Sequence, residues 1–284
     1  MLKSPPAAHR GALLSHLGVV RVQGTDATRF LQGQLSNDLT KLAPGTAMLA
    51  GLHNPQGRAI AVLRLVLMAP DLVLAVVPAE LVTPVVARLS KFVLRAKVKV
   101  SDGSAEWAVT AADAPEGAPT NSIAINAVEA QSVTTTDPSD IEAWRAGEIA
   151  AGMPQVYGAT SEAFVAQMLN LDSVGGIAFD KGCYTGQEVI ARAHYRGKVK
   201  RRMQRFRTTE AASLGVGDSG TLSDGRGFKV VDAVRLADGR TEFLAVAAIA
   251  AGADSEDAAS TTPPGNAESA IAVESLPLPY PLPV

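Results

Sequence analysis

Residues 181–188 read Lys-Gly-Cys-Tyr-Thr-Gly-Gln-Glu, and they say more about the fold than any other stretch of the chain. The third residue, Cys183, is the only cysteine among 284 residues. It lies in a turn between Gly182 and Gly186, and glycine lets a ligand approach the backbone closely. The stretch therefore predicts a turn that presents a thiol at a binding site.

A helix is expected directly after this turn. Thr185 suits the N-cap position, and Glu188 follows at the capping-box spacing. A thiol just before a helix start feels the positive end of the helix dipole. Lys181 and Arg192 would add positive potential. Both effects favour the thiolate, which is the nucleophilic and metal-binding form of cysteine.

The single cysteine also limits what the chain can hold. One thiol excludes a disulfide framework, and it excludes a zinc or iron–sulfur site built from several cysteines of this chain. A lone cysteine is often an inert core residue. Its neighbours here are polar and charged, so an inert thiol and a reactive one both stay open on the residues alone.

Length and charge narrow the class of protein. A chain of 284 residues exceeds the usual single-domain size, so two or three domains are expected. The formal net charge of −2 disfavours a globally basic nucleic-acid-binding protein. No run approaches the ~20 apolar residues of a membrane span, and residues 1–10 lack a convincing signal segment. We expect a soluble, cytoplasmic protein without a membrane partner.

Charge is distributed unevenly along the chain. Residues 181–207 contain nine Lys or Arg and a single acidic residue, Glu188, whereas residues 208–284 contain four Lys or Arg and eleven Asp or Glu. Two interpretations of the basic run at 196–207 stay open. It forms either a solvated strand face or a cradle for an anion such as a polyglutamate tail, a phosphate or RNA.

The chain before the motif alternates predicted strands and helices. A β-hairpin is predicted from 46–52 and 59–68, on either side of the polar turn 53–57. Thr25 is the expected N-cap of a short helix. A second helix is predicted to end near residue 93, and because of Pro84 its start is open between Glu80 and Thr83. Asp137 and Pro138 predict a helix start. Further strands are predicted at 17–22, 71–77, 97–100, 107–110, 122–128 and 132–136, and a short helix at 161–169.

After the motif the pattern changes to short β-like runs. They lie at 200–209, 220–222, 228–234, 241–249 and 271–276 and are separated by Gly and Asp turns. This spacing is typical of a small antiparallel barrel or sandwich. Residues 251–267 are rich in Ala, Ser, Asp and Pro, which predicts a mobile loop.

The motif at 181–188 closely resembles the signature of the YgfZ family of folate-binding proteins, which includes a mitochondrial iron–sulfur assembly factor. Residues 164–176 resemble the family's approach to the motif, and 191–201 its continuation. Residues 22–39 are similar to the opening shared with the glycine-cleavage aminomethyltransferase superfamily. Residues 276–280 are similar to the family's ending. The resemblance covers most of the chain, with 251–267 outside it.

The resemblance implies an α+β fold with three domains in a ring around a central opening. Residues 1–48 and 137–205 would together form a discontinuous folate-binding domain that carries the motif. Residues 49–136 would form a ferredoxin-like α/β domain, and residues 206–284 a small C-terminal β-barrel.

The resemblance also implies a cofactor and roles for particular residues. Family members bind tetrahydrofolate in the central cavity, near the motif cysteine. Cys183 would be the reactive or cluster-contacting thiolate, tuned by Lys181 and Arg192. The residues expected on the folate side are Trp144, Gly182, Tyr184, Gly186, Gln187 and Glu188, of which Gln187 and Glu188 would orient the loop.

Three positions bear on how closely the chain follows the family pattern. Trp144 falls where the family places an aromatic residue for the pterin, and an indole suits stacking, although a core role for it is equally open. Leu17 replaces a second tryptophan of the family. In the aminomethyltransferases an acidic residue follows the glycine of the hairpin tip, whereas here Arg58 follows Gly57.

The leading hypothesis is a tetrahydrofolate-binding accessory factor that supports assembly or repair of iron–sulfur clusters in client enzymes, including enzymes of tRNA processing. Its partners would be folate and iron–sulfur client proteins. One cysteine cannot hold a stable cluster alone, so any contact of Cys183 with a cluster would be transient or shared. No turnover reaction is predicted.

Two other hypotheses are retained. A folate-dependent one-carbon (aminomethyl or methyl) transferase is disfavoured by Arg58 at the hairpin tip. Direct RNA binding through 196–207 would give a salt-dependent affinity, but the run lacks paired aromatic residues and the chain is net negative.

Overall fold

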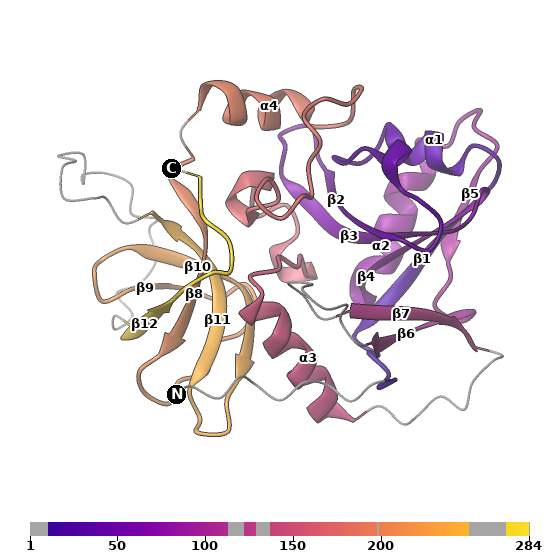
Figure 1. Cartoon of the computed structure of the whole chain (residues 1–284). Helices are drawn as coiled ribbons and strands as arrows, with labels where there is room; N and C mark the ends of the chain where they lie inside the picture. Colours follow the sequence, from indigo (N-terminus) through magenta and orange to yellow (C-terminus); the bar gives the residue numbers. More distant parts are fainter. Residues whose placement is uncertain (1–10, 113–121, 129–136, 198, 250–270, 284) are drawn as a thin grey trace.

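Two five-stranded antiparallel sheets lie on opposite sides of the molecule, with helix α3 and the segment that follows it between them (Figure 1). The computed structural model describes residues 11–112, 122–128, 137–197, 199–249 and 271–283. The predicted strand at 132–136 and the predicted loop at 251–267 lie outside these ranges. The expected mixture of helices and strands is confirmed, and the sheets are antiparallel.

The strands of the first sheet are β1 (Leu17–Gln23), β2 (Ala47–His53), β3 (Ala59–Ala69), β4 (Leu72–Pro78) and β5 (Lys99–Asp102), and a small separate pair consists of β6 (Trp107–Ala112) and β7 (Ser122–Ala127). The second sheet contains β8 (Arg201–Thr208), β9 (Ser219–Thr221), β10 (Gly227–Arg235), β11 (Thr241–Ala248) and β12 (Val273–Leu276). The α-helices are α1 (Ala27–Gln32), α2 (Ala79–Ser90), α3 (Pro138–Ala150) and α4 (Gln187–Arg196), and the 3₁₀ turns are η1 (Leu39–Lys41), η3 (Gly158–Thr160) and η4 (Ala166–Leu169).

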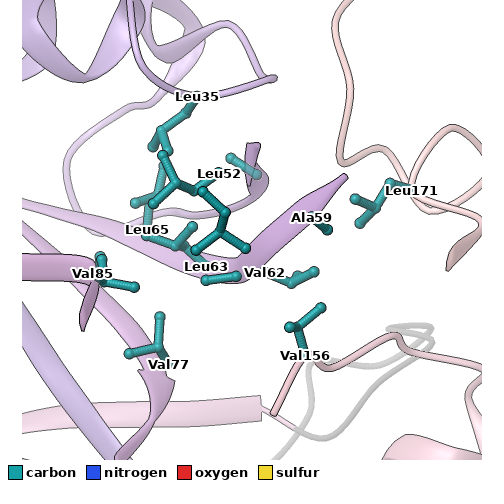
Figure 2. Packing of buried hydrophobic residues seen from close by; sticks show 14 of the residues in the cluster. Leu35, Leu52, Ala59, Val62, Leu63, Leu65, Val77, Val85, Val156 and Leu171 are labelled. Carbon is teal, nitrogen blue, oxygen red and sulfur yellow. The ribbon is translucent and has the colours of Figure 1, made fainter. Parts of the chain in front are cut away.

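The first sheet has the order β2-β3-β4-β1-β5 and supplies most of the main core. Leu63, Leu65 and Val77 are fully buried on it, as Figure 2 shows. Val156 and Leu171, far along the chain, belong to the same cluster. Burial of one such side chain stabilises the fold by about 1.5–3 kcal/mol, so this core also fixes the segment that leads to the motif.

The predicted hairpin is confirmed as the pair β2–β3. At its tip, the Asn54 Oδ1 accepts hydrogen bonds from the backbone N–H of Gln56 and of Arg58, each at 3.0 Å. Gly57 has φ +71°, a conformation that glycine adopts without strain. The tip is therefore a fixed turn rather than a loose loop.

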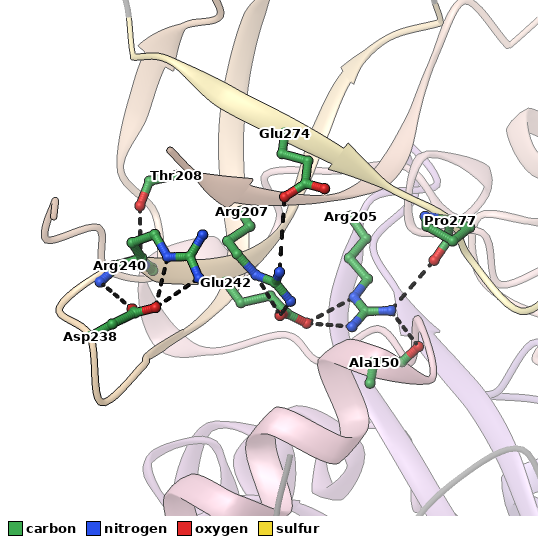
Figure 3. Close-up of polar contacts among 10 residues, drawn as sticks. Ala150, Arg205, Arg207, Thr208, Asp238, Arg240, Glu242, Glu274 and Pro277 are labelled. Carbon is green, nitrogen blue, oxygen red and sulfur yellow. Dashed lines mark hydrogen bonds and ion pairs between the residues drawn. The ribbon is translucent and has the colours of Figure 1, made fainter. Parts of the chain in front are cut away.

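The second sheet has the order β12-β8-β11-β10-β9, and Phe206, Phe228 and Phe243 form its core. On it, Arg205 and Arg207 both pair with Glu242, at 2.5 and 2.8 Å (Figure 3). The Arg205 Nη1 also donates to the carbonyl of Ala150, the last residue of α3, at 3.4 Å. These contacts tie the sheet to α3.

Three arginines of the basic run 196–207 agree with neither of the two interpretations given for it. Arg202 is 3% exposed and holds Asp172 in two parallel hydrogen bonds of 2.9 Å each. Arg205 and Arg207 are engaged with Glu242. These guanidinium groups are neither a solvated face nor an open anion cradle, because carboxylates distant in sequence already occupy them.

The predicted helix starts have mixed outcomes. The cap of α3 is confirmed, since the Asp137 carboxylate accepts from the N–H of Ser139 at 2.9 Å. The expected cap Thr25 is wrong: the N-cap of α1 is Asp26, whose carboxylate instead accepts from the N–H of Lys97. Helix α2 begins earlier than either predicted start, at Ala79, and continues through Pro84.

Two other features bear on the predicted organisation. The expected helix at 161–169 is reduced to the 3₁₀ turn η4, which ends at Asn170 with φ +56°. Strand β1 pairs with β4 and β5, so residues 17–23 complete the sheet formed by residues 47–102. The domain boundaries at 48 and 136 stay a prediction.

Candidate functional site

Lys181 anchors the motif to the first part of the chain. Its Nζ donates to the carbonyl oxygens of Gln32, Leu35 and Asn37, at 2.7, 2.6 and 2.7 Å. An ammonium group has three hydrogens, so these bonds use all of them. Burial lowers the pKa of Lys181 to about 8. The ammonium therefore fixes the loop, and its hydrogens are directed at carbonyls rather than at the thiol.

The side chain of Cys183 faces solvent, and that of Tyr184 faces the core. Cys183 is exposed, whereas Tyr184 is 8% exposed and belongs to the main core. The Lys181 Nζ lies 5.1 Å from the centre of the Tyr184 ring. Burial raises the pKa of Tyr184 to about 12, so its hydroxyl stays protonated at neutral pH. The buried tyrosine and the anchored lysine hold the thiol at the surface.

Helix α4 begins at Gln187, and its N-cap is Gly186 with φ +84° rather than Thr185. The predicted capping box is wrong because the left-handed conformation at Gly186 sets the start of the helix, and no side chain caps it. Glu188 pairs with Arg192 at 3.0 Å, with both side chains more than 70% exposed. Arg192 is thus directed at Glu188, and an exposed pair of this kind contributes little to stability.

The tip of the β2–β3 hairpin lies against the motif. A Cβ atom on Gly186 would come within 2.5 Å of the Asn54 carbonyl oxygen, and one on Gly57 within 3.0 Å of Val189. The Asn54 Nδ2 donates to Glu162 at 2.6 Å. Glu162 has φ +60°, an uncommon conformation for a residue with a side chain.

Sequence reasoning missed Glu162 and two histidine environments near the motif. His53 is fully buried and faces Tyr184, with 6.4 Å between the ring centres, and burial lowers its pKa to about 4. On α4, His194 stacks on Phe179 with 3.7 Å between ring centres. The positive φ of Glu162 has no sequence signal, since glycine is the residue expected there.

A second polar region lies around α3. A cleft of about 320 Å³ is lined by His16, Glu80, Ile141, Arg145, Tyr157, Ala159 and Val216. His16 directly precedes β1, Glu80 belongs to α2, and Ile141 and Arg145 belong to α3, so distant parts of the chain meet there. This volume is at the lower end of the range of about 300–1,000 Å³ for small-molecule sites.

A buried ion pair forms one side of this cleft. The Arg145 guanidinium contacts the Asp232 carboxylate, and the Tyr157 hydroxyl donates to the same carboxylate at 3.0 Å. A β-bulge between Val230 and Asp232 places Asp232 in this direction. Burial raises the pKa of Asp232, while Arg145 and the Tyr157 hydroxyl act in the opposite direction.

Trp144 lies behind His16, which separates the indole from the cleft. The indole is 4% exposed and packs with Leu17 in a separate small core. Its ring centre lies 5.3 Å from that of His16 and 5.1 Å from the guanidinium carbon of Arg64. The indole thus lies within a packed layer, and His16 is the residue of this group that lines the cleft.

The predicted site residues fall into two groups. Residues 181–188 and the hairpin tip are together beneath and beside α4, while Trp144 lies on α3, well away from α4 in Figure 1. Within the described ranges no three His, Cys, Asp or Glu side chains are arranged to hold a metal ion. No helix in the described part of the chain is long and apolar enough to cross a membrane.

Comparison with known proteins adds relatives for most of the chain. No family model matches it. It is 31% identical to an uncharacterized protein of Haemophilus influenzae over 71% of this chain and 75% of that protein. It is 30% identical to "tRNA-modifying protein YgfZ" of Edwardsiella ictaluri over 80% of this chain and 81% of that protein, and 29% identical to the Escherichia coli O157:H7 protein of that name, with coverage of 80% and 82%.

Among solved structures, the chain is similar to glycine cleavage system aminomethyltransferase T from Bartonella henselae. The TM-score is 0.62 at 14% identity, over 83% of this chain and 77% of that one. An identity this low establishes the likeness of fold alone. The antiparallel sheets and their connecting helices thus follow the aminomethyltransferase arrangement.

Proposed function

The chain belongs to the YgfZ family, and on that premise we propose that it supports tRNA modification as a tetrahydrofolate-binding accessory factor. It would act by assisting the assembly or repair of iron–sulfur clusters in client enzymes, including enzymes that modify tRNA. Relatives that carry the name "tRNA-modifying protein YgfZ" support the link to tRNA. The site of action would be the cytoplasm, with folate and cluster-containing clients as partners.

The observation that carries this proposal is the exposed thiol of Cys183 on an anchored loop. A fixed, accessible thiol suits brief contact with a cluster or with a client's own thiols. Iron–sulfur clusters are usually held by four thiolates. One cysteine would therefore share a cluster with a partner and not keep it.

Folate is the cofactor that the fold and family suggest, and the cleft at α3 would be its site. The lining combines the polar side chains of His16, Glu80 and Arg145 with apolar surface, which is the composition of a site for a heterocycle. His16, Glu80 and Arg145 would hold the ring, backed by Trp144. Bound tetrahydrofolate would supply a carrier for one-carbon groups.

We also propose that the chain is divided into three domains. Residues 1–48 with 137–205, residues 49–136 and residues 206–284 would be three domains arranged as a ring, the last a small barrel. The likeness to an aminomethyltransferase supports this arrangement. In such a ring, the cleft beside α2 and α3 would face the opening.

The test is complementation of a cell that lacks the native protein. Cys183→Ser should fold normally and fail to restore activity of an iron–sulfur tRNA-modifying enzyme, read as the modified nucleoside content of tRNA. Serine keeps the size of the side chain but supplies no anion at neutral pH, and oxygen is a harder ligand than sulfur. Thr185→Ser, in the same loop, is the matched control and should restore modification. Full rescue by Cys183→Ser would refute a role for the thiol.

Glu162 favours a second candidate function, folate-dependent one-carbon transfer. Its carboxylate accepts a hydrogen bond from Asn54 at the hairpin tip. The tip itself has Arg58 where the aminomethyltransferases have an acidic residue, so Glu162 would supply the carboxylate there. This candidate predicts turnover of a methylamine donor with tetrahydrofolate, and loss of that turnover in Glu162→Gln. Absence of turnover together with rescue of tRNA modification would favour the accessory factor.

A further inference from the structure

The turn between α2 and β5, residues 91–98, carries the most exposed large apolar side chain of the described residues. Leu94 is 89% exposed, and Phe92, two residues earlier, is 39% exposed. Leu94 also has φ +36°, in the left-handed region that leucine rarely adopts. Because an uncommon backbone conformation costs free energy, its presence at an exposed leucine points to a function of the turn.

The rest of the turn is fixed to the body of the molecule. The N–H of Ala96 donates to the Val93 carbonyl at 2.8 Å, which closes the turn around Leu94. The side chains of Val93 and Ala96 pack against the main core. The Asp26 carboxylate accepts from the N–H of Lys97 at 2.7 Å. With its neighbours held inward, Leu94 is presented to solvent by a fixed turn.

Positive charge is concentrated around this apolar tip. Between residues 80 and 102 the chain contains five Lys or Arg and no Asp or Glu, and the five are Arg88, Lys91, Arg95, Lys97 and Lys99. The last four are exposed, and none of the five forms an ion pair with another described residue. The chain as a whole has a net charge of −2, so this excess is local. Such a patch attracts an anionic partner.

The apolar residues favour an anionic lipid surface as that partner. RNA is bound through aromatic rings that stack on bases, but the Arg88 guanidinium carbon lies over the Phe92 ring, 5.4 Å from its centre, and Leu94 has no ring. Leucine is also uncommon among the residues that anchor protein interfaces. An apolar tip flanked by Lys and Arg is instead the composition of segments that bind membrane surfaces.

We propose that the turn 91–98 binds the surface of a membrane that contains anionic lipids. Leu94 and Phe92 enter the boundary between headgroups and acyl chains, and the exposed cations contact the headgroups. The expectation of no membrane partner considered spanning segments, which a peripheral contact does not need.

The position of the turn keeps the contact separate from the cleft. Strand β5 is the edge of the first sheet, on the side away from the second sheet (Figure 1). Glu80 of the cleft lies at the other end of α2, whose 12 residues span about 18 Å. The proposal therefore does not depend on the proposed folate function.

The experiment measures binding of the full chain to vesicles by co-sedimentation, with vesicles of phosphatidylcholine alone and of phosphatidylcholine mixed equally with phosphatidylglycerol. The wild type should bind the anionic vesicles at least roughly tenfold more tightly, and this preference should shrink as salt is added. Leu94→Asn should lower the affinity for anionic vesicles roughly tenfold, because it removes the apolar tip. Asparagine tolerates the left-handed conformation, so the turn is kept. Leu94→Met keeps an apolar side chain and should bind like the wild type.

Arg95→Gln tests the charge and should weaken binding to anionic vesicles roughly fivefold. Arg235→Gln is the matched control, since it removes an exposed arginine from β10 in the second sheet, and it should bind like the wild type. Equal effects of the two arginine variants, or a wild-type chain that does not prefer anionic vesicles, would overturn the proposal. Binding to a tRNA transcript that Arg95→Gln weakens, without binding to vesicles, would assign the turn to RNA and overturn it as well. Thermal unfolding of each variant verifies that it is folded.

Discussion

Gly186 of the motif lies directly against Asn54 at the tip of the β2–β3 hairpin, too close for any side chain between them: an added Cβ would stand 2.5 Å from the Asn54 carbonyl oxygen. The contact joins residues 132 positions apart in sequence (186 − 54). Since Gly186 also starts α4, the hairpin tip sets the position of both the helix and the loop that bears the thiol.

Gly186→Ala should therefore destabilise the protein by roughly 2–4 kcal/mol. The substitution adds the strain of a positive φ to a collision with backbone. Chemical denaturation gives the free energy of unfolding. Gly182→Ala is the control, because a Cβ there would meet no atom within 4 Å, and its effect should stay within about 0.5 kcal/mol. Equal stability of the two variants would contradict the close contact.

Lys181→Met should cost roughly 2–4 kcal/mol of stability. It removes three charge-assisted hydrogen bonds and leaves the carbonyls of residues 32, 35 and 37 without their donor. Lys41→Met provides the comparison, since Lys41 is 62% exposed and its ion pairs with Asp38 and Asp180 are 3.5 Å long. If both variants unfold at the same denaturant concentration, Lys181 is not an anchor.

Cys183 should react with a small alkylating reagent in the native state, because its side chain is exposed. One label per chain is expected, since the sequence has a single cysteine. The rate at pH 7 should equal or exceed that of the unfolded chain, measured by mass spectrometry. Labelling that requires denaturant would instead support an inert core thiol.

The stability of the protein should fall as the pH drops from about 6.5 to about 4. Burial holds the pKa of His16 at about 4, below its ordinary value of 6.5. In this window the unfolded chain binds the proton more readily, so protonation favours unfolding. The full loss from one such histidine is up to about 3 kcal/mol. His16→Phe, which keeps a ring beside Trp144, should show a shallower pH dependence in denaturant titrations. An unchanged slope would contradict the buried neutral imidazole.

Local patterns predicted some elements correctly and failed at others. The β2–β3 hairpin follows from alternating apolar residues around a polar turn, and the start of α3 follows from Asp137 and Pro138. The start of α4 did not, because Thr185 and Glu188 match a capping box while the left-handed Gly186 takes the N-cap position. A short capping pattern carries no information about the distant hairpin tip, whose contact with Gly186 enforces this conformation.

The partners of charged residues could not be predicted from sequence. Lys181 binds carbonyls near α1, and Arg202 binds Asp172, and no spacing in the sequence marks either contact. The cleft likewise joins His16, Glu80 and Arg145, which no spacing rule connects. Such contacts depend on the tertiary arrangement, whereas motifs and periodicity report on neighbours along the chain.

The anchor of Lys181 also has a consequence for the order of events during synthesis. Its three acceptors, at residues 32, 35 and 37, leave the ribosome long before the donor does. All strands of the first sheet precede the donor as well. The thiol can thus be locked into its exposed position only on a nascent chain whose earlier part has emerged and is free to fold. Display of Cys183 in its final geometry thereby requires that the carbonyls of residues 32, 35 and 37 are already brought together.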